Sequence, residues 1–440
     1  MPSTTALDTL LGLKEVLNLA IDAVSEEWKT HGFPASLQDP FSSVREDSLP
    51  TPRLYEATKR ALGAADMLQA LLRDPRDQLM ACAAQYFESR ALHAASAARI
   101  PDILHQAWLE GKSDGLTAEE LSQKTGYEKN KCGTNAFSRI MRLLATSHIF
   151  NQTGPETFSN NRTSAALINN RALANYIDLY GGEWYASSQH LIEAFKDDSL
   201  ALERAAFTQE KTYNPEGKTY WDYNDENTER HDMFATAMAG SAQTNLWALL
   251  TDYPWDKLGK ATIVDVGGGI GGLSLPLSKK YGDLSVVIQD RESVIAQAEN
   301  HWKANHSTAI SDQLHGAEVY MLRYIMDDWN DDACIKILSA IKEKSKVLIV
   351  EALLIPAWFP PHAASTLSIA PKPLLPNYGQ PQRFIHCRDL NMMNLINGTE
   401  RTVSEMTSVI ERAGLVVEKI WECRGAVHIT ECVLPAGGAA

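Results

Sequence analysis

The stretch ATIVDVGGGIGG, residues 261–272, decides the fold of this chain. Its first half is a short, mainly apolar run of the kind that forms a buried strand, and LSLPLSKKYG follows it as a helix. Consecutive glycines between a strand and a helix let the backbone approach a ligand closely and leave the helix N-terminal amides free to bind it. The stretch therefore predicts a strand–turn–helix unit with a ligand at the turn.

The ligand of this glycine turn is not fixed by the glycines alone. Gly267, Gly269 and Gly272 satisfy the G-x-G-x-x-G pattern, which by itself is a weak sign of NAD binding. Asp265 precedes the glycines, where a carboxylate would face a ligand amino group better than a pyrophosphate. Asp290 ends the next predicted strand and could hold the ribose of either kind of cofactor. NAD is disfavoured but stays open, as does a structural turn without a ligand.

Strands and helices alternate from the glycine turn to the C-terminus. After the first unit come predicted strands in LSVVIQD, AEVYMLRYI and KVLIVEALLI, with a helix in DDACIKILSAIKEK. ERTVSEMTSVIERAG is a capped helix, and LVVEKIWEC and GAVHITECVL are two strands joined by a short turn. Repeated strand–helix units predict a parallel, doubly wound sheet, and the closing hairpin adds a reversed last strand. We assign residues 256–440 to this domain.

The N-terminal part, residues 1–170, is predicted to be helical and to contain a winged helix. LYEATKRALGAADMLQALL carries apolar residues at helical spacing, and such Ala-rich helices would bury their faces against a second copy or on their own chain. LTAEELSQKTG and NAFSRIMRLLATSHIF are two further helices, followed by a turn between short extended pieces. Arg139 and Arg142 are the only arginine or lysine residues in the second of these helices, so a structural or dimer-forming role is favoured over DNA binding.

Residues 171–255 are predicted to be a helical linker rich in aromatic and methionine side chains. TERHDMFATAMAGSAQTNLWALL, which contains Met233, Phe234 and Met238, is its clearest helix. Such stripes are usually core. Because they directly precede a nucleotide-type domain, we keep two interpretations open, a core and the wall of a substrate pocket.

Charge and composition exclude several classes of function. The 440 residues carry a net charge of −14, which argues against nucleic acid as a partner because phosphate binding needs a basic surface. No long apolar run occurs, so we expect no membrane span. The six cysteines are dispersed and form no CxxC pair, which predicts free thiols, no metal site and a cytoplasmic location.

Five ordered motifs give the chain a resemblance to a known family. VDVGGGIGG, VVIQDRESVI, GAEVYMLRYIMDDWNDD, LIVEALLIP and NGTERTVSEMTSVIERAGL occur in the order seen in plant- and fungal-type O-methyltransferases, and the resemblance covers nearly the whole chain. It implies a Rossmann-like, seven-stranded methyltransferase sheet, an N-terminal dimerisation domain and a homodimer with interlocking helices. It also implies a small aromatic or polyketide-like substrate between the domains.

The resemblance also implies S-adenosylmethionine as the cofactor and assigns site residues. The predicted cofactor-binding residues are Asp265, Gly267, Gly268, Gly269, Asp290, Arg291 and Arg323. Predicted substrate-pocket residues are Met233, Phe234, Met238 and Met392.

One departure from the family falls on the catalytic base. The family has a histidine before Asp-Trp, and this histidine removes the proton of the substrate hydroxyl. Here the segment is Met326-Asp327-Asp328-Trp329, so Asp327 stands at the base position. The two carboxylates that flank the histidine in the family match Glu351 and Glu400. A model aspartate pKa of about 3.9 suits a base poorly, whereas acidic neighbours would favour a protonated, hydrogen-bond-donating carboxyl.

Two more departures lie around this centre. By spacing, His306-Ser307-Thr308-Ala309 stands where the family has an aspartate that contacts adenine. Residues 356–389 form a long, proline-rich stretch where the family has a shorter lid. His362, Lys372 and His386 lie on it, and we expect solvated loop residues there, although one of them could replace the missing histidine.

Three functional hypotheses follow. We favour a pericyclase that binds S-adenosylmethionine without consuming it, as in fungal relatives that lack the histidine and guide dehydration and hetero-Diels–Alder or Alder-ene cyclisation of polyketide–pyridone intermediates. A shaped pocket, donors to a carbonyl and a fixed cation would suit such a step. The alternatives are an active O-methyltransferase acting on a phenolic or polyketide hydroxyl and a binding protein without catalysis.

Overall fold

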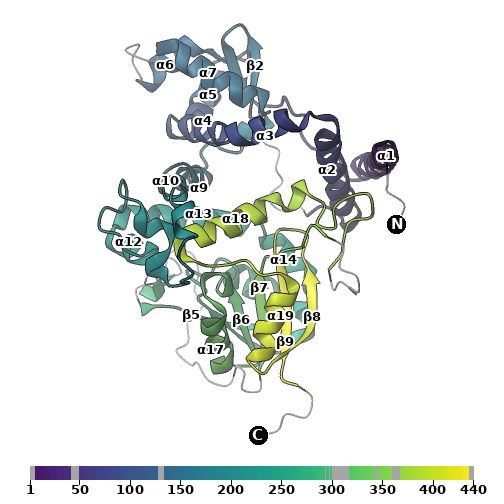
Figure 1. Ribbon diagram of the computed structural model, residues 1–440, viewed down its shortest axis with the longest axis vertical. Coiled ribbons are helices and arrows are strands. Elements are labelled where there is room, and N and C mark those ends of the chain that lie inside the picture. Colours follow the sequence, from purple (N-terminus) through teal and green to yellow (C-terminus); the bar gives the residue numbers. More distant parts are fainter. Residues whose placement is uncertain are drawn as a thin grey trace.

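The computed structural model describes residues 5–40, 49–126, 133–292, 294–296, 298–299, 317–341, 345–358 and 367–435. The helical N-terminal part lies at one end of the molecule and the large sheet at the other (Figure 1). The predicted departure at His306–Ala309 and the loop residue His362 fall outside the described residues.

Five helices open the chain, and their starts follow their capping residues. They are α1 (Ala6–His31), α2 (Pro52–Leu72), α3 (Pro75–Ala84), α4 (Tyr86–Ala97) and α5 (Ile100–Leu109). Thr5 and Asp8 form a capping box at α1, and Thr51 caps α2 with a proline in its first turn. Helices α1 and α2 pack against each other, but α3 buries none of its residues.

A winged-helix unit follows, as predicted. It consists of β1 (Leu116–Thr117), α6 (Ala118–Thr125), α7 (Gly133–Thr146), β2 (Phe150–Gly154) and β3 (Thr157–Asn160), with the strands in the order β1-β3-β2. Thr117 and Glu120 form the predicted capping box. Leu121, Met141 and Phe158 are fully buried between the helices and the wing.

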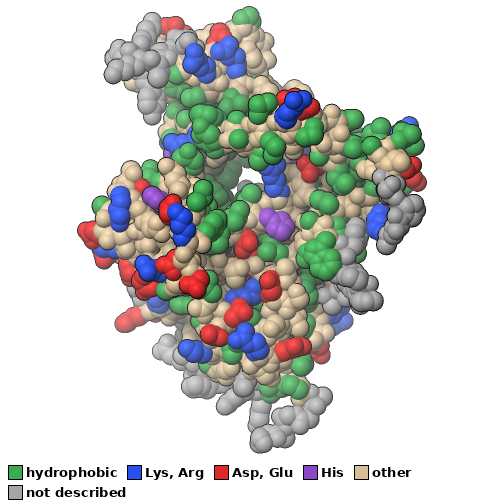
Figure 2. Space-filling model, viewed as in Figure 1, with side chains coloured by type: hydrophobic (Ala, Val, Ile, Leu, Met, Phe, Trp, Pro, Cys, Tyr) green, Lys and Arg blue, Asp and Glu red, His purple; other side chains and the backbone are tan. Residues whose placement is uncertain are grey.

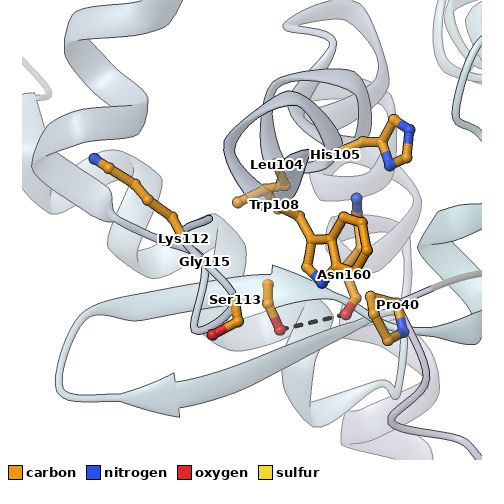
Figure 3. Close-up of a pocket in the computed structure, with 9 residues that line it drawn as sticks. Pro40, Leu104, His105, Trp108, Lys112, Ser113, Gly115 and Asn160 are labelled. Carbon is orange, nitrogen blue, oxygen red and sulfur yellow. Dashed lines mark hydrogen bonds between the residues drawn. The ribbon is translucent and has the colours of Figure 1, made fainter. Parts of the chain in front are cut away.

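A cleft lies on this unit beside β3 (Figure 3). Its wall includes Trp108 from α5 and Asn160 from the wing, whose carbonyl accepts a hydrogen bond from Ser159 Oγ at 3.3 Å. The cleft belongs to the winged helix and not to the part of the chain that holds the glycine turn.

The middle of the chain is helical, as expected. It contains α8 (Arg162–Ala165), α9 (Arg171–Gly181), α10 (Glu183–Ser188), α11 (Leu191–Ala194), η1 (Leu202–Arg204), η2 (Ala206–Gln209), α12 (Tyr220–Glu226), α13 (Thr228–Gln243), α14 (Leu246–Asp252) and η3 (Trp255–Leu258). Helix α13 packs along α9. Aromatic rings of this region contact one another edge to face, for example Phe207 and Tyr220 with centroids 5.1 Å apart.

The sheet has six strands among the described residues, in the order β5-β4-β6-β7-β9-β8. They are β4 (Thr262–Val266), β5 (Ser285–Gln289), β6 (Val319–Arg323), β7 (Lys346–Glu351), β8 (Val416–Glu422) and β9 (His428–Val433). The first four pair in parallel, and β9 runs antiparallel between β7 and β8. The doubly wound sheet with a reversed last strand is confirmed. Of the seven strands expected, these six are described, and residues 300–316 between β5 and β6 lie outside the description.

Helices cover both faces of the sheet because the strand residues are apolar on both sides. Leu348 and Val350 of β7 pack with α14 and α15 (Ser274–Lys280), whereas Val347 and Ile349 pack on the other face with α17 (Asp331–Ile341) and α19 (Val403–Arg412). The core therefore continues through the sheet and fixes the strand ends at which the predicted site residues lie.

The proline-rich stretch 356–389 is not a loop throughout. Residues 380–389 form the first part of α18 (Gln380–Ile396), so His386 is a helical residue and not a loop residue as expected. Gln380 and Pro381 start this helix, since proline suits a first helical turn. Helix α18 runs between the N-terminal helices and the sheet (Figure 1). Among the described helices, none combines the length and apolarity that crossing a membrane requires.

Candidate active site

The glycine turn is held in shape by the acidic residue of the neighbouring strand. Gly267 and Gly269 have φ values of 68° and 58°, which side chains with a Cβ adopt only at a cost. The Gly269 N–H donates to Asp290 Oδ2 at 2.8 Å, and the Gly267 N–H donates to the Gln289 carbonyl at 2.7 Å. A Cβ on Gly267 would also meet the Ile325 side chain at 2.4 Å. The conformation of the turn therefore favours glycine at these positions.

Asp265 offers a buried acceptor below the turn. Its Oδ2 accepts a hydrogen bond from Ser274 Oγ at 2.5 Å, whereas its Oδ1 is buried without a hydrogen-bond partner. Burial raises the pKa of Asp265 to about 6, although Ser274 and Arg323 oppose the shift. An unpaired buried carboxylate oxygen of this kind is costly unless a ligand donor completes it.

Two arginines lie at this end of the sheet in different settings. Arg323 ends β6, and a Cβ on Gly272 would lie 3.6 Å from its Nη2, so the guanidinium reaches the glycine turn. Arg291 Nη1 lies instead 2.9 Å from Asp225 Oδ2 of α12. Arg291 therefore connects the cofactor side of the sheet to the helical middle of the chain.

Asp327 is buried in a short 3-10 helix, η4 (Met326–Asp328), that follows β6. Within the part of the chain that the structure describes, its Oδ1 has no hydrogen-bond partner. Its backbone carbonyl accepts the Thr399 N–H at 2.9 Å, and a Cβ on Gly398 would lie 2.4 Å from that oxygen. These contacts fix the main chain at Asp327, whereas Oδ1 of its carboxylate keeps an unused capacity to accept a hydrogen bond.

Glu351 and Glu400 are both buried near Asp327, but they act differently. Glu351 Oε1 accepts the N–H groups of Ile325 and Met326 at 3.1 and 2.5 Å, so it orients the backbone before Asp327 and not the Asp327 side chain. Glu400 Oε1 accepts from Arg388 Nε at 2.5 Å. Arg388 Nη2 in turn lies 3.9 Å from Asp327 Oδ2.

Arg388 was missed by the sequence analysis. It lies on α18, its guanidinium is 5.0 Å from the centroid of the Tyr324 ring, and its Nη2 is buried without a hydrogen-bond partner. One arginine within a polar helix carries no distinguishing signal. Arg388 also lies two residues after His386, within the stretch that was expected to be a loop, so no sequence pattern places it near Asp327.

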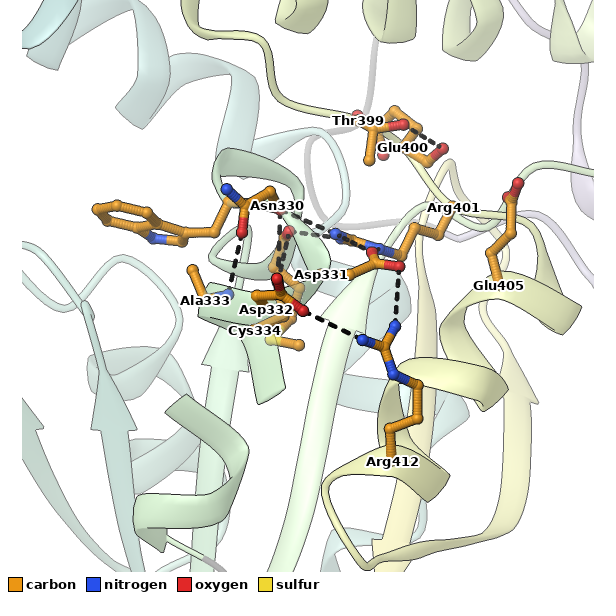
Figure 4. Close-up of polar contacts among 12 residues, drawn as sticks. Asn330, Asp331, Asp332, Ala333, Cys334, Thr399, Glu400, Arg401, Glu405 and Arg412 are labelled. Atoms are coloured by element: carbon orange, nitrogen blue, oxygen red, sulfur yellow. Dashed lines mark hydrogen bonds and ion pairs between the residues drawn. The ribbon is translucent and has the colours of Figure 1, made fainter. Parts of the chain in front are cut away.

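A second arginine, Arg401, lies beside the segment that follows Asp327 (Figure 4). Arg401 Nη1 donates to the Met326 carbonyl at 2.6 Å and its Nη2 donates to the Trp329 carbonyl at 2.8 Å. Arg401 also pairs with Asp331, which Arg412 contacts from α19 at 3.5 Å. These contacts hold both ends of η4.

The carboxyl groups of this centre hold protons more tightly than free ones. Burial raises the pKa of Asp327, against the opposing charge of Arg388. Burial and the charge of Asp327 raise the pKa of Glu351 well above its usual range and that of Glu400 to about 7. Burial and the charges of Asp327 and Glu400 raise the pKa of Asp328 well above its usual range. The centre is therefore an acidic cluster that favours bound protons, with the cations of Arg388 and Arg401 close to Asp327.

The four predicted substrate-pocket residues come together. Met233, Phe234 and Met238 from α13 and Met392 from α18 pack around one aromatic cluster that includes Tyr220. Because Arg388 lies one turn before Met392 on α18, this cluster adjoins the acidic centre.

The middle and C-terminal parts match a known domain. The sequence model of the O-methyltransferase domain matches residues 195–416, and that of the O-methyltransferase dimerisation domain matches residues 80–170. O-methyltransferase tpcA of Aspergillus fumigatus is 32% identical over 97% of this chain and 96% of its own length. O-methyltransferase gedA of Aspergillus terreus is 34% identical over 96% of each chain.

Solved structures share the fold. The mitomycin 7-O-methyltransferase MmcR has a TM-score of 0.63 at 22% identity and covers 84% of this chain and 99% of its own. The calicheamicin methyltransferase CalO1, solved in an S-adenosylhomocysteine-bound form, has a TM-score of 0.60 at 22% identity over 82% of this chain and 99% of its own. The chain belongs to the O-methyltransferase family, whose cofactor is S-adenosylmethionine.

Proposed function

We propose that the chain is an active O-methyltransferase that uses Asp327 as the base toward a phenolic or polyketide hydroxyl. The observation that carries the proposal is the buried Asp327 Oδ1, which has no hydrogen-bond partner among the described residues and is predicted to stand at the base position of the family. Burial raises the pKa of this carboxyl and so brings it closer to the pKa of a phenol, which makes Asp327 a better base than a solvent-exposed aspartate. The relatives named above, which match over nearly their whole length, are O-methyltransferases by name.

The residues at the glycine turn fit the cofactor. S-adenosylmethionine, when bound, supplies an electrophilic methyl group on a sulfonium sulfur. Asp265 Oδ1 offers a buried acceptor for its amino group, and Asp290, beside the turn, would hold the ribose hydroxyls. Gly267, Gly268 and Gly269 would let the backbone approach it. Arg323 reaches the same turn, whereas Arg291 would act through its pair with Asp225.

The protein's own groups prepare the substrate. The substrate hydroxyl would donate to Asp327 Oδ1 and transfer its proton there as the oxygen becomes nucleophilic. Glu351 and Arg401 fix the backbone on either side of Asp327, so the carboxylate keeps its direction. Glu400 holds Arg388 beside it.

Hydrophobic residues would hold the body of the substrate. Met233, Phe234, Met238 and Met392 belong to the aromatic cluster next to the acidic centre. Figure 2 shows a hollow between the helical N-terminal part and the sheet, with hydrophobic side chains gathered along its edge. Flexible methionines and aromatic rings suit a flat, apolar ligand, as expected for an aromatic polyketide.

A homodimer would cover the exposed N-terminal helices. Helix α3 buries no residue, and apolar side chains are exposed around it, with Leu72, Leu79 and Met80 at 72%, 71% and 63% exposure. Contiguous exposed apolar side chains mark an association surface. A Leu79→Glu, Met80→Glu double variant should shift the protein from dimer to monomer in light scattering, whereas Gln78→Glu on the same helix should not.

Mass spectrometry tests the reaction. Purified protein would be incubated with S-adenosylmethionine and a panel of phenols and polyketide–pyridone alcohols, and both cofactor and substrate masses would be followed. We expect a product heavier by one methylene with an equal amount of S-adenosylhomocysteine. Asp327→Asn should abolish it, while Asn330→Asp, at an exposed position nearby, should not.

A pericyclase is the second candidate, and one observation favours it. Burial and mutual repulsion raise the pKa values of Asp327, Asp328, Glu351 and Glu400, so at least one carboxyl would be protonated and able to donate to a substrate carbonyl. A product that is isomeric with its precursor or lighter by water, without S-adenosylhomocysteine, would establish this function and refute methyl transfer.

A further inference from the structure

We infer that Arg388 binds the substrate oxygen as an anion, so that the enzyme selects acidic phenols over ordinary alcohols. The inference rests on the proposed methyl transfer and names the substrate class of that site. Its basis is the proximity of a buried donor, Arg388 Nη2, and a buried acceptor, Asp327 Oδ1, neither of which has a hydrogen-bond partner among the described residues.

The guanidinium of Arg388 is fixed on two sides. Its Nε is held by Glu400 Oε1 at 2.5 Å, and its plane lies 5.0 Å from the centroid of the buried Tyr324 ring. With Nε committed, Nη2 is the end that faces the Asp327 carboxylate, 3.9 Å from Oδ2. That distance is too long for a hydrogen bond, so both groups keep capacity for a third partner.

An oxygen bound between these groups would serve both. A hydroxyl donates one hydrogen bond and accepts others, so it can donate to Asp327 Oδ1 and accept from Arg388 Nη2. When its O–H bond breaks, the proton goes to Asp327 and the electron pair stays on oxygen, opposite the arginine cation. The oxygen would then bond to the methyl carbon of S-adenosylmethionine, and the carbon–sulfur bond would break with its electron pair staying on the sulfur, which leaves as S-adenosylhomocysteine. Guanidinium–anion hydrogen bonds are strong where water is excluded.

The selectivity follows from how the charge is shared. The positive charge of Arg388 stabilises a negative charge on the ligand. Because Glu400 and Asp327 already neutralise part of that positive charge, the stabilisation is limited. A weak acid such as an alkyl alcohol would leave its proton in place, whereas an acidic phenol would be bound as phenolate. The titratable groups around the guanidinium are Tyr176, Tyr180, Tyr324, Asp327, Asp328 and Glu400.

Binding of 4-nitrophenol tests the inference without requiring turnover, because its anion has a distinct absorbance. Full-length protein with S-adenosylhomocysteine would be titrated with 4-nitrophenol across pH, in the wild type and in Arg388→Lys, Arg388→Met and Arg383→Met. Arg383 is the control, since it is exposed on the same helix and contacts Gln85.

We expect the wild type and Arg383→Met to bind the anion preferentially and to lower the apparent pKa of the bound phenol. Arg388→Met should lose roughly tenfold or more in anion affinity, the worth of one charge-assisted hydrogen bond, and Arg388→Lys should retain part of it. An Arg388→Met, Glu400→Gln double variant removes both charges and guards against misfolding from an unpaired Glu400. An unshifted phenol pKa in the wild type, or a shift that survives in both Arg388→Met proteins, overturns the inference.

Turnover separates the inference from the proposed function. If a panel of phenols and alcohols yields no S-adenosylhomocysteine with wild-type protein, the proposed function fails, whatever the spectra show. If methylation occurs but its rate is insensitive to phenol acidity and to Arg388→Met, methyl transfer stands and the role of Arg388 fails alone.

Discussion

Arg388 and Glu400 form a buried ion pair, with Nε of the arginine 2.5 Å from Oε1 of the glutamate. The pair joins α18 to the segment before α19 and places a cation beside Asp327. The arrangement couples the stability of the fold to the charge of the site, because buried charges are tolerated only when they are paired.

Removing one member of this pair should destabilise the protein. Glu400→Gln leaves the mostly buried Arg388 guanidinium without its hydrogen-bonded carboxylate, with Asp327 Oδ2 3.9 Å away, and we expect a loss of about 3 kcal/mol in the free energy of unfolding. Urea denaturation at pH 8, where Glu400 with its pKa of about 7 is mainly ionised, gives the measurement. Glu411→Gln, at an exposed position of α19, is the control. A single variant as stable as wild type would show that the pair contributes nothing.

Asp328→Asn should stabilise the protein at high pH. Burial and the charges of Asp327 and Glu400 raise the pKa of Asp328, so the folded state holds a proton that the unfolded state has released. Wild-type stability therefore falls as pH rises from about 4 toward the raised pKa. We expect the variant to gain at least about 1 kcal/mol over wild type at pH 8, the equivalent of one pKa unit, and nothing at pH 4.

Thermal or urea unfolding of both proteins across pH measures this difference, with Asp283→Asn at an exposed turn as the control. An Asp328→Asn curve that runs parallel to the wild-type curve at all pH values would contradict the proposed repulsion.

Asp265→Asn should weaken binding of S-adenosylmethionine. The substitution replaces a charged acceptor by a neutral one beneath the glycine turn, and one hydrogen bond to a charged group corresponds to roughly a tenfold to hundredfold change in affinity. Calorimetric titration with S-adenosylmethionine and S-adenosylhomocysteine checks this. Both share the amino group that Asp265 would bind, so both should lose affinity together. Asp256→Asn is the exposed control, and equal affinities for the two proteins would remove Asp265 from the binding site.

His428 should limit stability in acid. It is buried, and its Nδ1 accepts the Leu353 N–H at 3.2 Å, so it is neutral in the folded protein. Burial lowers its pKa to about 4 from an ordinary value of 6.5. The unfolded state therefore gains protons first, and stability falls as pH drops from 6.5 to about 4, by up to about 3 kcal/mol. His428→Gln should flatten this acid limb in pH-dependent urea unfolding, and an unchanged slope would assign the loss to other groups.

The sequence by itself determined the strands of the sheet and most of the helices, with α18 as an exception. The glycine turn, the apolar strands on both of its sides, and the capping boxes at Thr117 and Thr402 act within a few residues, so they can be recognised without knowing the fold. Motif order identified the family and predicts that Asp327 stands at the position of the family's catalytic base. Asp265 and Asp290 are predicted cofactor-binding residues, and the parallel pairing of β4 with β5 places them at the same edge of the sheet.

Only the tertiary structure decided how the acidic centre is assembled. Arg388 and Asp327 lie far apart in the chain and meet because α18 crosses the end of the sheet, a packing event that no local pattern records. The same holds for Glu351, whose carboxylate meets backbone amides and not the Asp327 side chain. Burial, which sets the protonation of all these groups, is a property of the packed chain, because it depends on the solvent that distant segments exclude.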